Sequence, residues 1–274
     1  MPYITVLTNV REVPYLRAVV AGTRENTGMS LWLGDQLALN VRRGHTPFYR
    51  RLKRVAVAVR SSSMPTPGFL NPVFRGLFQC HQALWRAGGF LQGYFYTGPL
   101  FRARCESVGR HFRICSMPYV VGHARIYIGD QVNFFGKVDI MSGGIFDEPK
   151  LVLGDRVDIG HNVVFLVNKE IVIEHDVNVA SGVRFMDSDA HPRDTAERIA
   201  DLPPRPEEVK PVRICRYAWI GQNSFILKGV TIGEGAIVGV SSVVVTDIPP
   251  YSVAMGNPAR VVVKNAVPVP TAVA

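Results

Sequence analysis

The sequence has few cysteines and none of the paired spacing that metal or disulfide sites need. It contains only Cys80, Cys105, Cys115 and Cys215, with no Cys-x-x-Cys pair. This excludes a zinc knuckle and a disulfide framework, and favours reduced thiols in the cytosol. The first ten residues are followed at once by a charged pair, which is not the pattern of a secretory signal. We therefore expect a cytoplasmic protein.

Long apolar runs are also missing. The longest uncharged stretch of the first hundred residues, 87–101, has 15 residues and contains four glycines and a proline. It is too short and too interrupted to cross a membrane. The whole chain of 274 residues is 47% hydrophobic and 19% charged, with 25 Gly and 19 Pro. That composition excludes disorder and predicts a globular protein with many turns and short regular elements.

Acidic residues are absent from one long segment. Residues 36–105 contain no Asp or Glu and eleven Lys or Arg, whereas the overall net charge is only +9. Such a segment can attract an anionic lipid surface or remain a solvated basic face. Nothing in it resembles a nucleic-acid-binding module. We expect peripheral contact with an anionic membrane through residues 36–105, at the inner face of the membrane, and no binding of nucleic acid.

A helix is expected inside this basic segment. Asn71-Pro72 is a helix-start signal, apolar residues follow at helical spacing, and Gly88-Gly89 is expected to end the helix. A second aromatic cluster comes after it, at residues 90–96. This region could lie in a lipid interface or cover the open end of a repeat structure.

From residue 108 onward the sequence repeats every six residues. The first position of each hexad is aliphatic or aromatic, the fifth is small or branched, and the second is often Gly. The 18 hexads fall in five runs, and the last is unbroken. It runs through Ile214, Ile220, Ile226, Ile232, Val238 and Val244.

A period of six predicts a prism of three short parallel strands per turn, with the first hexad position inside and a backbone-tolerant residue at each corner. Three hexads make one coil, so about six coils are expected. We expect an all-β solenoid at residues 108–264, interrupted by a long loop at 191–213, after a basic and partly helical leader at 1–107. Residues 265–274 form a tail. Long loops in solenoids commonly carry residues for ligand binding or catalysis.

The densest motifs lie between Met186 and Val262. They include Asp-Ser-Asp-Ala-His-Pro at 187–192, Tyr-Ala-Trp-Ile-Gly at 217–221, Leu-Lys-Gly-Val-Thr-Ile-Gly at 227–233 and Gly-Asn-Pro-Ala-Arg at 256–260. With these motifs in order and in register, the chain resembles the hexapeptide-repeat acyltransferases, most closely the maltose, galactoside and polysaccharide O-acetyltransferases. The resemblance covers residues 108–264. It implies a left-handed parallel β-helix, a homotrimer, and acetyl transfer from acetyl-CoA to a sugar hydroxyl without a metal.

The resemblance also implies a catalytic base. His191 stands at the family's catalytic histidine position, and a base is needed because a sugar hydroxyl is too weakly acidic to attack a thioester unaided. Asp187 or Asp189 is close enough in sequence to orient the imidazole, and the sequence leaves open which one does. The plainer interpretation of His191 is a turn residue before Pro192.

Other site residues come from the same resemblance. Those expected at the coenzyme are Gln222, Val240, Val245, Thr246, Arg260 and Lys264. Those expected at the acceptor are Asn162, Asn168 and Trp219, although the acceptor positions match the relatives less well. We therefore expect an unusual sugar, such as a cell-surface polysaccharide or a lipid-linked glycan.

Several alternatives share the fold. An N-acetyltransferase acting on an amino sugar and a serine acetyltransferase would use the same donor and histidine. A γ-type carbonic anhydrase needs two histidines five residues apart on one coil, and no such pair occurs here. A non-enzymatic scaffold would need neither His191 nor affinity for acyl-CoA.

Overall fold

The computed structural model describes residues 33–63 and 67–264, which divide into two compact units on either side of residue 74. The first unit contains α2 (Leu33–Arg43) and α3 (Pro47–Ser61), then the 3-10 turn Gly68–Leu70 and the start of α4 (Asn71–Gln92). Thr46 caps α3 by accepting the N–H of Tyr49 at 3.3 Å. None of the described helices is long and apolar enough to span a membrane.

Most of α4 lies in the second unit and continues past the position where we expected it to end. The helix passes through Gly88 and Gly89 to Gln92 and then opens into a π-helical turn, Gly93–Thr97. The prediction of an end at Gly88-Gly89 is therefore wrong. Two glycines lower helix propensity, but neither adopts a positive φ and no proline follows to stop the helix.

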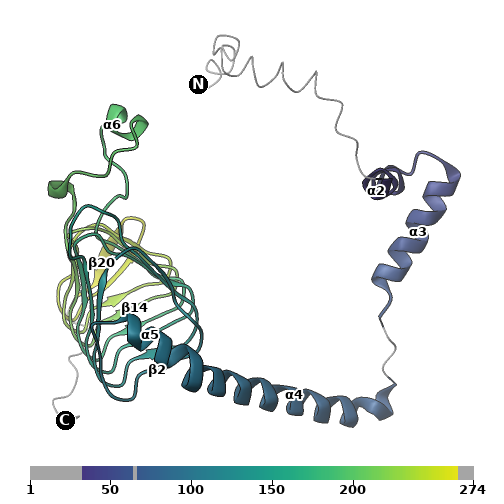
Figure 1. Cartoon of the computed structure of the whole chain (residues 1–274), viewed down its shortest axis with the longest axis horizontal. Coiled ribbons are helices and arrows are strands. Elements are labelled where there is room, and N and C mark those ends of the chain that lie inside the picture. The colour runs from purple at the N-terminus through teal and green to yellow at the C-terminus, as the bar shows by residue number, and fades with distance from the viewer. Residues whose placement is uncertain (1–32, 64–66, 265–274) are drawn as a thin grey trace. The chain divides into compact units, whose positions relative to one another are not determined.

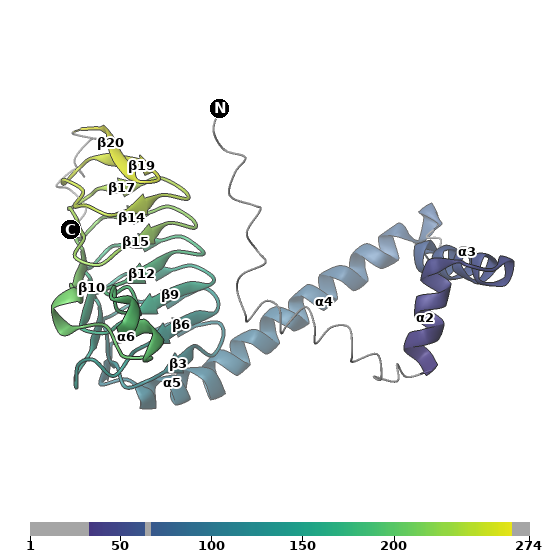
Figure 2. The same ribbon diagram turned by 90° about the horizontal axis from the view of Figure 1, so that it is seen from above.

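The solenoid is a left-handed parallel β-helix, as predicted (Figures 1 and 2). Its strands form three sheets, which are parallel except for the antiparallel pair β19–β20 at the end of the second. The first sheet contains β1 (Ser107–Val108), β4 (Arg125–Ile128), β7 (Lys150–Leu153), β10 (Glu170–Ile173), β13 (Val212–Ile214) and β16 (Thr231–Ile232). The second contains β2 (Arg113–Ile114), β5 (Asn133–Phe134), β8 (Asp158–Ile159), β11 (Asn178–Val179), β14 (Trp219–Ile220) and β17 (Ile237–Val238), and ends in β19 (Val253–Gly256) and β20 (Ala259–Val263). The third contains β3 (Tyr119–Val121), β6 (Val138–Met141), β9 (Val163–Leu166), β12 (Arg184–Met186), β15 (Phe225–Ile226) and β18 (Val243–Val244).

The hexad pattern predicts the core well. Of the eighteen first-position residues only Val108 and Val120, both in the first coil, are half-buried, and the rest are buried. Each coil also stacks its inward residues on those of the next, as the Phe165 and Phe185 rings do with centroids 5.2 Å apart. Buried apolar columns of this kind stabilise each strand pair through its neighbours.

The corner glycines serve a purpose other than the one expected. Gly154 does not have a positive φ, but a Cβ there would lie 2.7 Å from the backbone nitrogen of His175 in the next coil. The left-handed conformation falls two residues later, on Arg156, Asp176 and Tyr217 in successive coils. At Gly154 glycine therefore fits a close approach of adjacent coils, and the unusual backbone angles are adopted both by non-glycine residues and by Gly182, Gly229 and Gly235.

A short helix closes the first coil. α5 (Gly98–Arg104) places Phe101, which is 2% exposed, against Phe112 and Phe134 at ring distances of 5.9 and 6.0 Å. The Arg102 guanidinium donates to the carbonyl oxygens of Val108 and Gly109. The end of the leader thus caps the solenoid, one of the two roles that the sequence left open.

Candidate functional site

The long loop leaves the third sheet after β12 and returns to the first sheet at β13. It spans residues 187–211 and carries α6 (Thr195–Ile199) and the 3-10 turn Pro206–Glu208. In Figure 2 it projects from the side of the stacked coils. Its two ends are joined, because Lys210 N donates to Asp187 O at 2.9 Å and Gly229 N donates to Lys210 O at 3.1 Å. His191 lies on this loop close to the anchored end, and its side chain is exposed.

Asp187 is fully buried and anchors the start of the loop. Its carboxylate accepts the backbone N–H groups of Asn168, Lys169 and Glu170 at 2.6–2.9 Å. Burial raises the pKa of Asp187, and these N–H donors act against that rise. Both oxygens are therefore bonded to the preceding coil, so Asp187 shapes the backbone from which His191 projects.

Asn168 takes part in the same buried cluster. It is 3% exposed, donates from Nδ2 to Ser188 Oγ at 2.6 Å, and accepts from Gly143 N at 3.1 Å. Its amide is thus already bonded within the chain. Asn162, the other expected acceptor residue, is exposed at the opposite end of β9. The structure does not bring these two residues together.

Asp189 has a partner that the sequence reasoning missed. Lys228, in the turn after β15, places Nζ 2.6 Å from Asp189 Oδ2, and its side chain is only 13% exposed. Arg193 Nε lies 3.6 Å from the same oxygen. A partly buried ion pair therefore connects the residue two before His191 to the next coil. The sequence could have predicted this ion pair, because both segments follow strands of the third sheet and therefore meet at one corner.

The remaining predicted residues divide between two places. Val245 and Thr246 follow β18 of the third sheet, on the corner where Lys228 lies one coil earlier. The others belong to the second sheet or the corner that follows it: Trp219, Gln222, Val240, Arg260 and, after β20, Lys264. The Trp219 side chain points outward and is 53% exposed. One chain thus places the candidate residues in two groups, which are called half-sites below, one on the loop side and one around Trp219.

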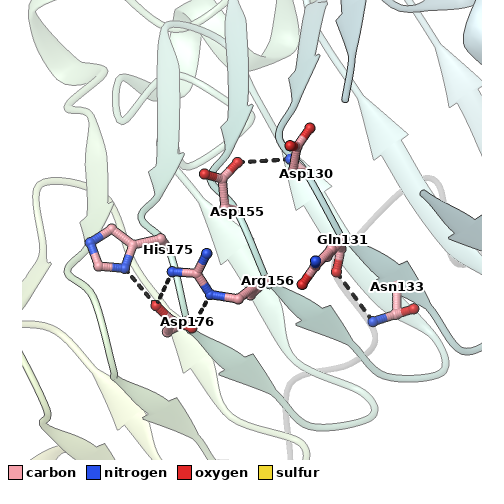
Figure 3. Close-up of polar contacts among 7 residues, drawn as sticks. All are labelled: Asp130, Gln131, Asn133, Asp155, Arg156, His175 and Asp176. Carbon is pink, nitrogen blue, oxygen red and sulfur yellow. Dashed lines mark hydrogen bonds and ion pairs between the residues drawn. The ribbon is translucent and has the colours of Figure 1, made fainter. Parts of the chain in front are cut away.

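A charged corner lies between the first and second sheets, away from the candidate residues (Figure 3). Arg156 makes two hydrogen bonds of 2.7 Å to Asp176, which also lies 2.7 Å from His175 Nδ1. A groove of about 990 Å³ runs beside this corner, over the outer face of the first sheet. Among its charged side chains, Arg213 pairs with Glu174 and Arg216 with Glu234, while Asp155 and Asp247 accept backbone N–H groups. It contains none of the predicted site residues.

In the described parts of the chain, no cluster of three or more His, Cys, Asp or Glu side chains is placed to hold a metal ion. Acyl transfer by a histidine base needs no such cluster.

Comparisons with known proteins give a consistent class. A putative acetyltransferase of Saccharomyces cerevisiae is 36% identical over 114 residues, 42% of this chain and 56% of that protein. One of Schizosaccharomyces pombe is 35% identical over 107 residues (39% and 49%), and one of Staphylococcus aureus is 50% identical over 64 residues (23% and 32%). The chain therefore spans about half, or less, of the length of these curated relatives.

Solved structures with a similar fold are also acyltransferases by description. An N-acyltransferase from Bacillus cereus is 20% identical, with a TM-score of 0.48, over 62% of this chain and 90% of that one. A maltose O-acetyltransferase from Clostridium difficile is 27% identical, with a TM-score of 0.39, over 62% and 75%. No family model matches the chain. The curated relatives confirm the expected resemblance to acetyltransferases.

Proposed function

We propose that this relative of the putative acetyltransferases transfers an acetyl group from acetyl-CoA to a hydroxyl of a sugar, with His191 as the general base. One observation carries the proposal: His191 projects, exposed, from a loop whose start is fixed by the buried Asp187 and by the Asp189–Lys228 ion pair. A base must be accessible to substrate yet held in position, and this arrangement provides both.

The proposed chemistry is direct transfer. His191 takes the proton of the acceptor hydroxyl as the oxygen attacks the thioester carbonyl carbon. The resulting tetrahedral oxyanion needs a donor, and a backbone N–H of a neighbouring coil is the group we propose. The C–S bond then breaks, the imidazolium returns its proton to the departing coenzyme thiolate, and an O-acetyl sugar and free coenzyme A result.

The two half-sites favour an oligomer. Trp219 and its neighbours lie on the second sheet, whereas His191 leaves the third sheet. We propose a homotrimer in which the half-site around Trp219 of one subunit faces the loop of the next, with acetyl-CoA between them. Arg260 and Lys264, both exposed, would bind phosphates of the coenzyme. Sedimentation analysis that gave only a monomer in the presence of acetyl-CoA would contradict this arrangement.

The acceptor is the least determined part of the proposal. Because Asn168 is bonded inside the chain and Asn162 lies at another corner, the acceptor contacts expected from relatives of simple-sugar specificity are not assembled. This supports a different acceptor, and we propose a cell-surface polysaccharide or a lipid-linked glycan.

Substitution of His191 tests the mechanism. His191→Ala should lower acetyl transfer, assayed across a panel of glycans, by roughly 10² to 10⁴, because the base is lost. Affinity for acetyl-CoA, measured by calorimetric titration, should be kept. His161→Ala removes another exposed histidine, at a different corner, and should leave transfer unchanged. Full activity in His191→Ala would refute the base, and a wild-type chain that binds no acyl-CoA would refute the enzyme.

A further inference from the structure

Helix α4 exposes large apolar side chains along its whole length. None of its 22 residues is buried. Leu84, Trp85 and Phe90 are 74%, 72% and 68% exposed, values unusual for side chains of this size. A contiguous exposed apolar surface marks a site of contact with a partner or a membrane.

Most of the large apolar side chains share one side of the helix, although Phe90 lies on the other. At 100° per residue, the apolar side holds Val73, Phe74, Leu77, Phe78, Leu84, Trp85 and Leu91. The opposite side carries Arg75, Gln79, Gln82 and Arg86. The first set, together with the aromatic turn described next, is called the aromatic face.

The aromatic face continues beyond α4. In the π-helical turn, Tyr94, Phe95 and Tyr96 are 65%, 71% and 58% exposed. Burial begins only at Thr97 and Phe101, where the chain caps the first coil. The backbone of the turn approaches the first coil, since a Cβ at Gly93 would lie 2.8 Å from Ile114 O, but the aromatic side chains of Tyr94, Phe95 and Tyr96 remain exposed.

Charge identifies the kind of partner. The segment 36–105 has eleven bases and no acid, so two copies packed through the same helix would bring like charges together. An anionic bilayer instead complements the charge, and Trp and Tyr favour the depth where acyl chains meet headgroups. Arg75 and Arg86, on the polar side, can extend toward the phosphates.

Helix α3 has the same character. It carries Arg50, Arg51, Lys53, Arg54 and Arg60, and none of its residues is buried. Phe48, Val55 and Val59 are 66%, 59% and 68% exposed. Two basic amphipathic helices of one chain give two signals for interfacial binding, and one weak signal alone seldom anchors a protein.

We propose that the aromatic face inserts into the interface of an anionic bilayer, while the bases of α3 and α4 bind its headgroups. The binding is peripheral, because none of the described helices is long and apolar enough to span the bilayer. It does not depend on acetyl transfer, so either proposal can fail alone.

The test is sedimentation of the full-length protein with phosphatidylcholine vesicles that do or do not contain phosphatidylserine. The wild type should bind the anionic vesicles, and binding should weaken as salt rises. Leu84→Gln combined with Trp85→Gln should weaken binding at least about tenfold, because neither position then transfers a large apolar side chain from water into the bilayer. Gln79→Ala with Gln82→Ala, on the polar side of the same helix, is the matched control and should bind as the wild type does.

Two further readouts keep the outcomes distinct. Circular dichroism must show that the Leu84→Gln, Trp85→Gln variant keeps its helix. Addition of anionic vesicles should shift the tryptophan emission of the wild type to the blue. The emission of Trp85→Phe should not shift. Wild-type protein that does not sediment, or a double variant that sediments equally well, would overturn the proposal. The proposal would also be overturned if the double variant formed a smaller oligomer than the wild type in the absence of lipid. The aromatic face would then bind a second copy of the chain.

Discussion

The solenoid and the helix α4 use apolar residues in opposite ways. In the solenoid the repeated aliphatic and aromatic positions are buried, with most at 0–4% exposure, and each coil covers the next. In α4 a similar density of large apolar side chains lies exposed, with no residue buried. The sequence of the solenoid is therefore explained by its own fold, whereas nothing in the described part of the chain covers the apolar side chains of α4.

The sharpest test of this difference replaces one phenylalanine in each region. Phe101→Ala removes a ring that is 2% exposed and packed on Phe112 and Phe134, so we expect a loss of about 4 kcal/mol of unfolding free energy. Phe95→Ala removes a ring that is 71% exposed and should change the unfolding free energy by less than about 0.5 kcal/mol. Denaturant unfolding of the full chain measures both. Equal losses would mean that the aromatic face is packed within the chain.

Glycine substitutions should have opposite signs in the two regions. A Cβ at Gly221 would lie 2.5 Å from Val238 O in the next coil, so Gly221→Ala should cost about 2 kcal/mol. A Cβ at Gly88 would meet no atom within 4 Å beyond the backbone of its own helix, so Gly88→Ala should stabilise the helix by about 1 kcal/mol. Thermal unfolding followed by circular dichroism gives both values. A destabilising Gly88→Ala would indicate that α4 packs closely at this position.

The same contrast explains what the sequence could predict. The hexads predict the buried positions because a residue in a repeat meets the same neighbours one coil away. The end predicted at Gly88-Gly89 is wrong because a local signal of about 1 kcal/mol per glycine does not outweigh a continuing helix. Sequence also left Asp187 and Asp189 as equivalent candidates, and only the coil-to-coil contacts distinguish the buried anchor from the partner of Lys228.

The Asp189–Lys228 ion pair connects the loop to the solenoid, and breaking it should make the loop more mobile. Lys228→Met keeps the aliphatic stem but removes the charge, so we expect trypsin to cleave about tenfold faster after Arg193 or Arg198, with acetyl-CoA affinity unchanged. Lys228→Arg should restore most of the protection. Mass spectrometry of the cleavage products measures the rates, and equal cleavage in all three proteins would show that the pair does not hold the loop.

The smallest expected effect is at the charged corner, where the solenoid meets solvent. Hydrogen bonds from Arg156, assisted by His175, lower the pKa of Asp176 below its ordinary value of 3.8. Because the folded pKa is lower than the unfolded one, the carboxylate stabilises the fold above about pH 4, and that stability is lost as the pH falls through the folded pKa. Asp176→Asn keeps a residue that tolerates the positive φ of 58° and should cost about 0.5 kcal/mol at pH 7. Denaturant unfolding from pH 7 to pH 2 should show that the difference in unfolding free energy between the wild type and Asp176→Asn shrinks toward acid. A difference independent of pH would mean that the charge of Asp176 does not contribute to stability.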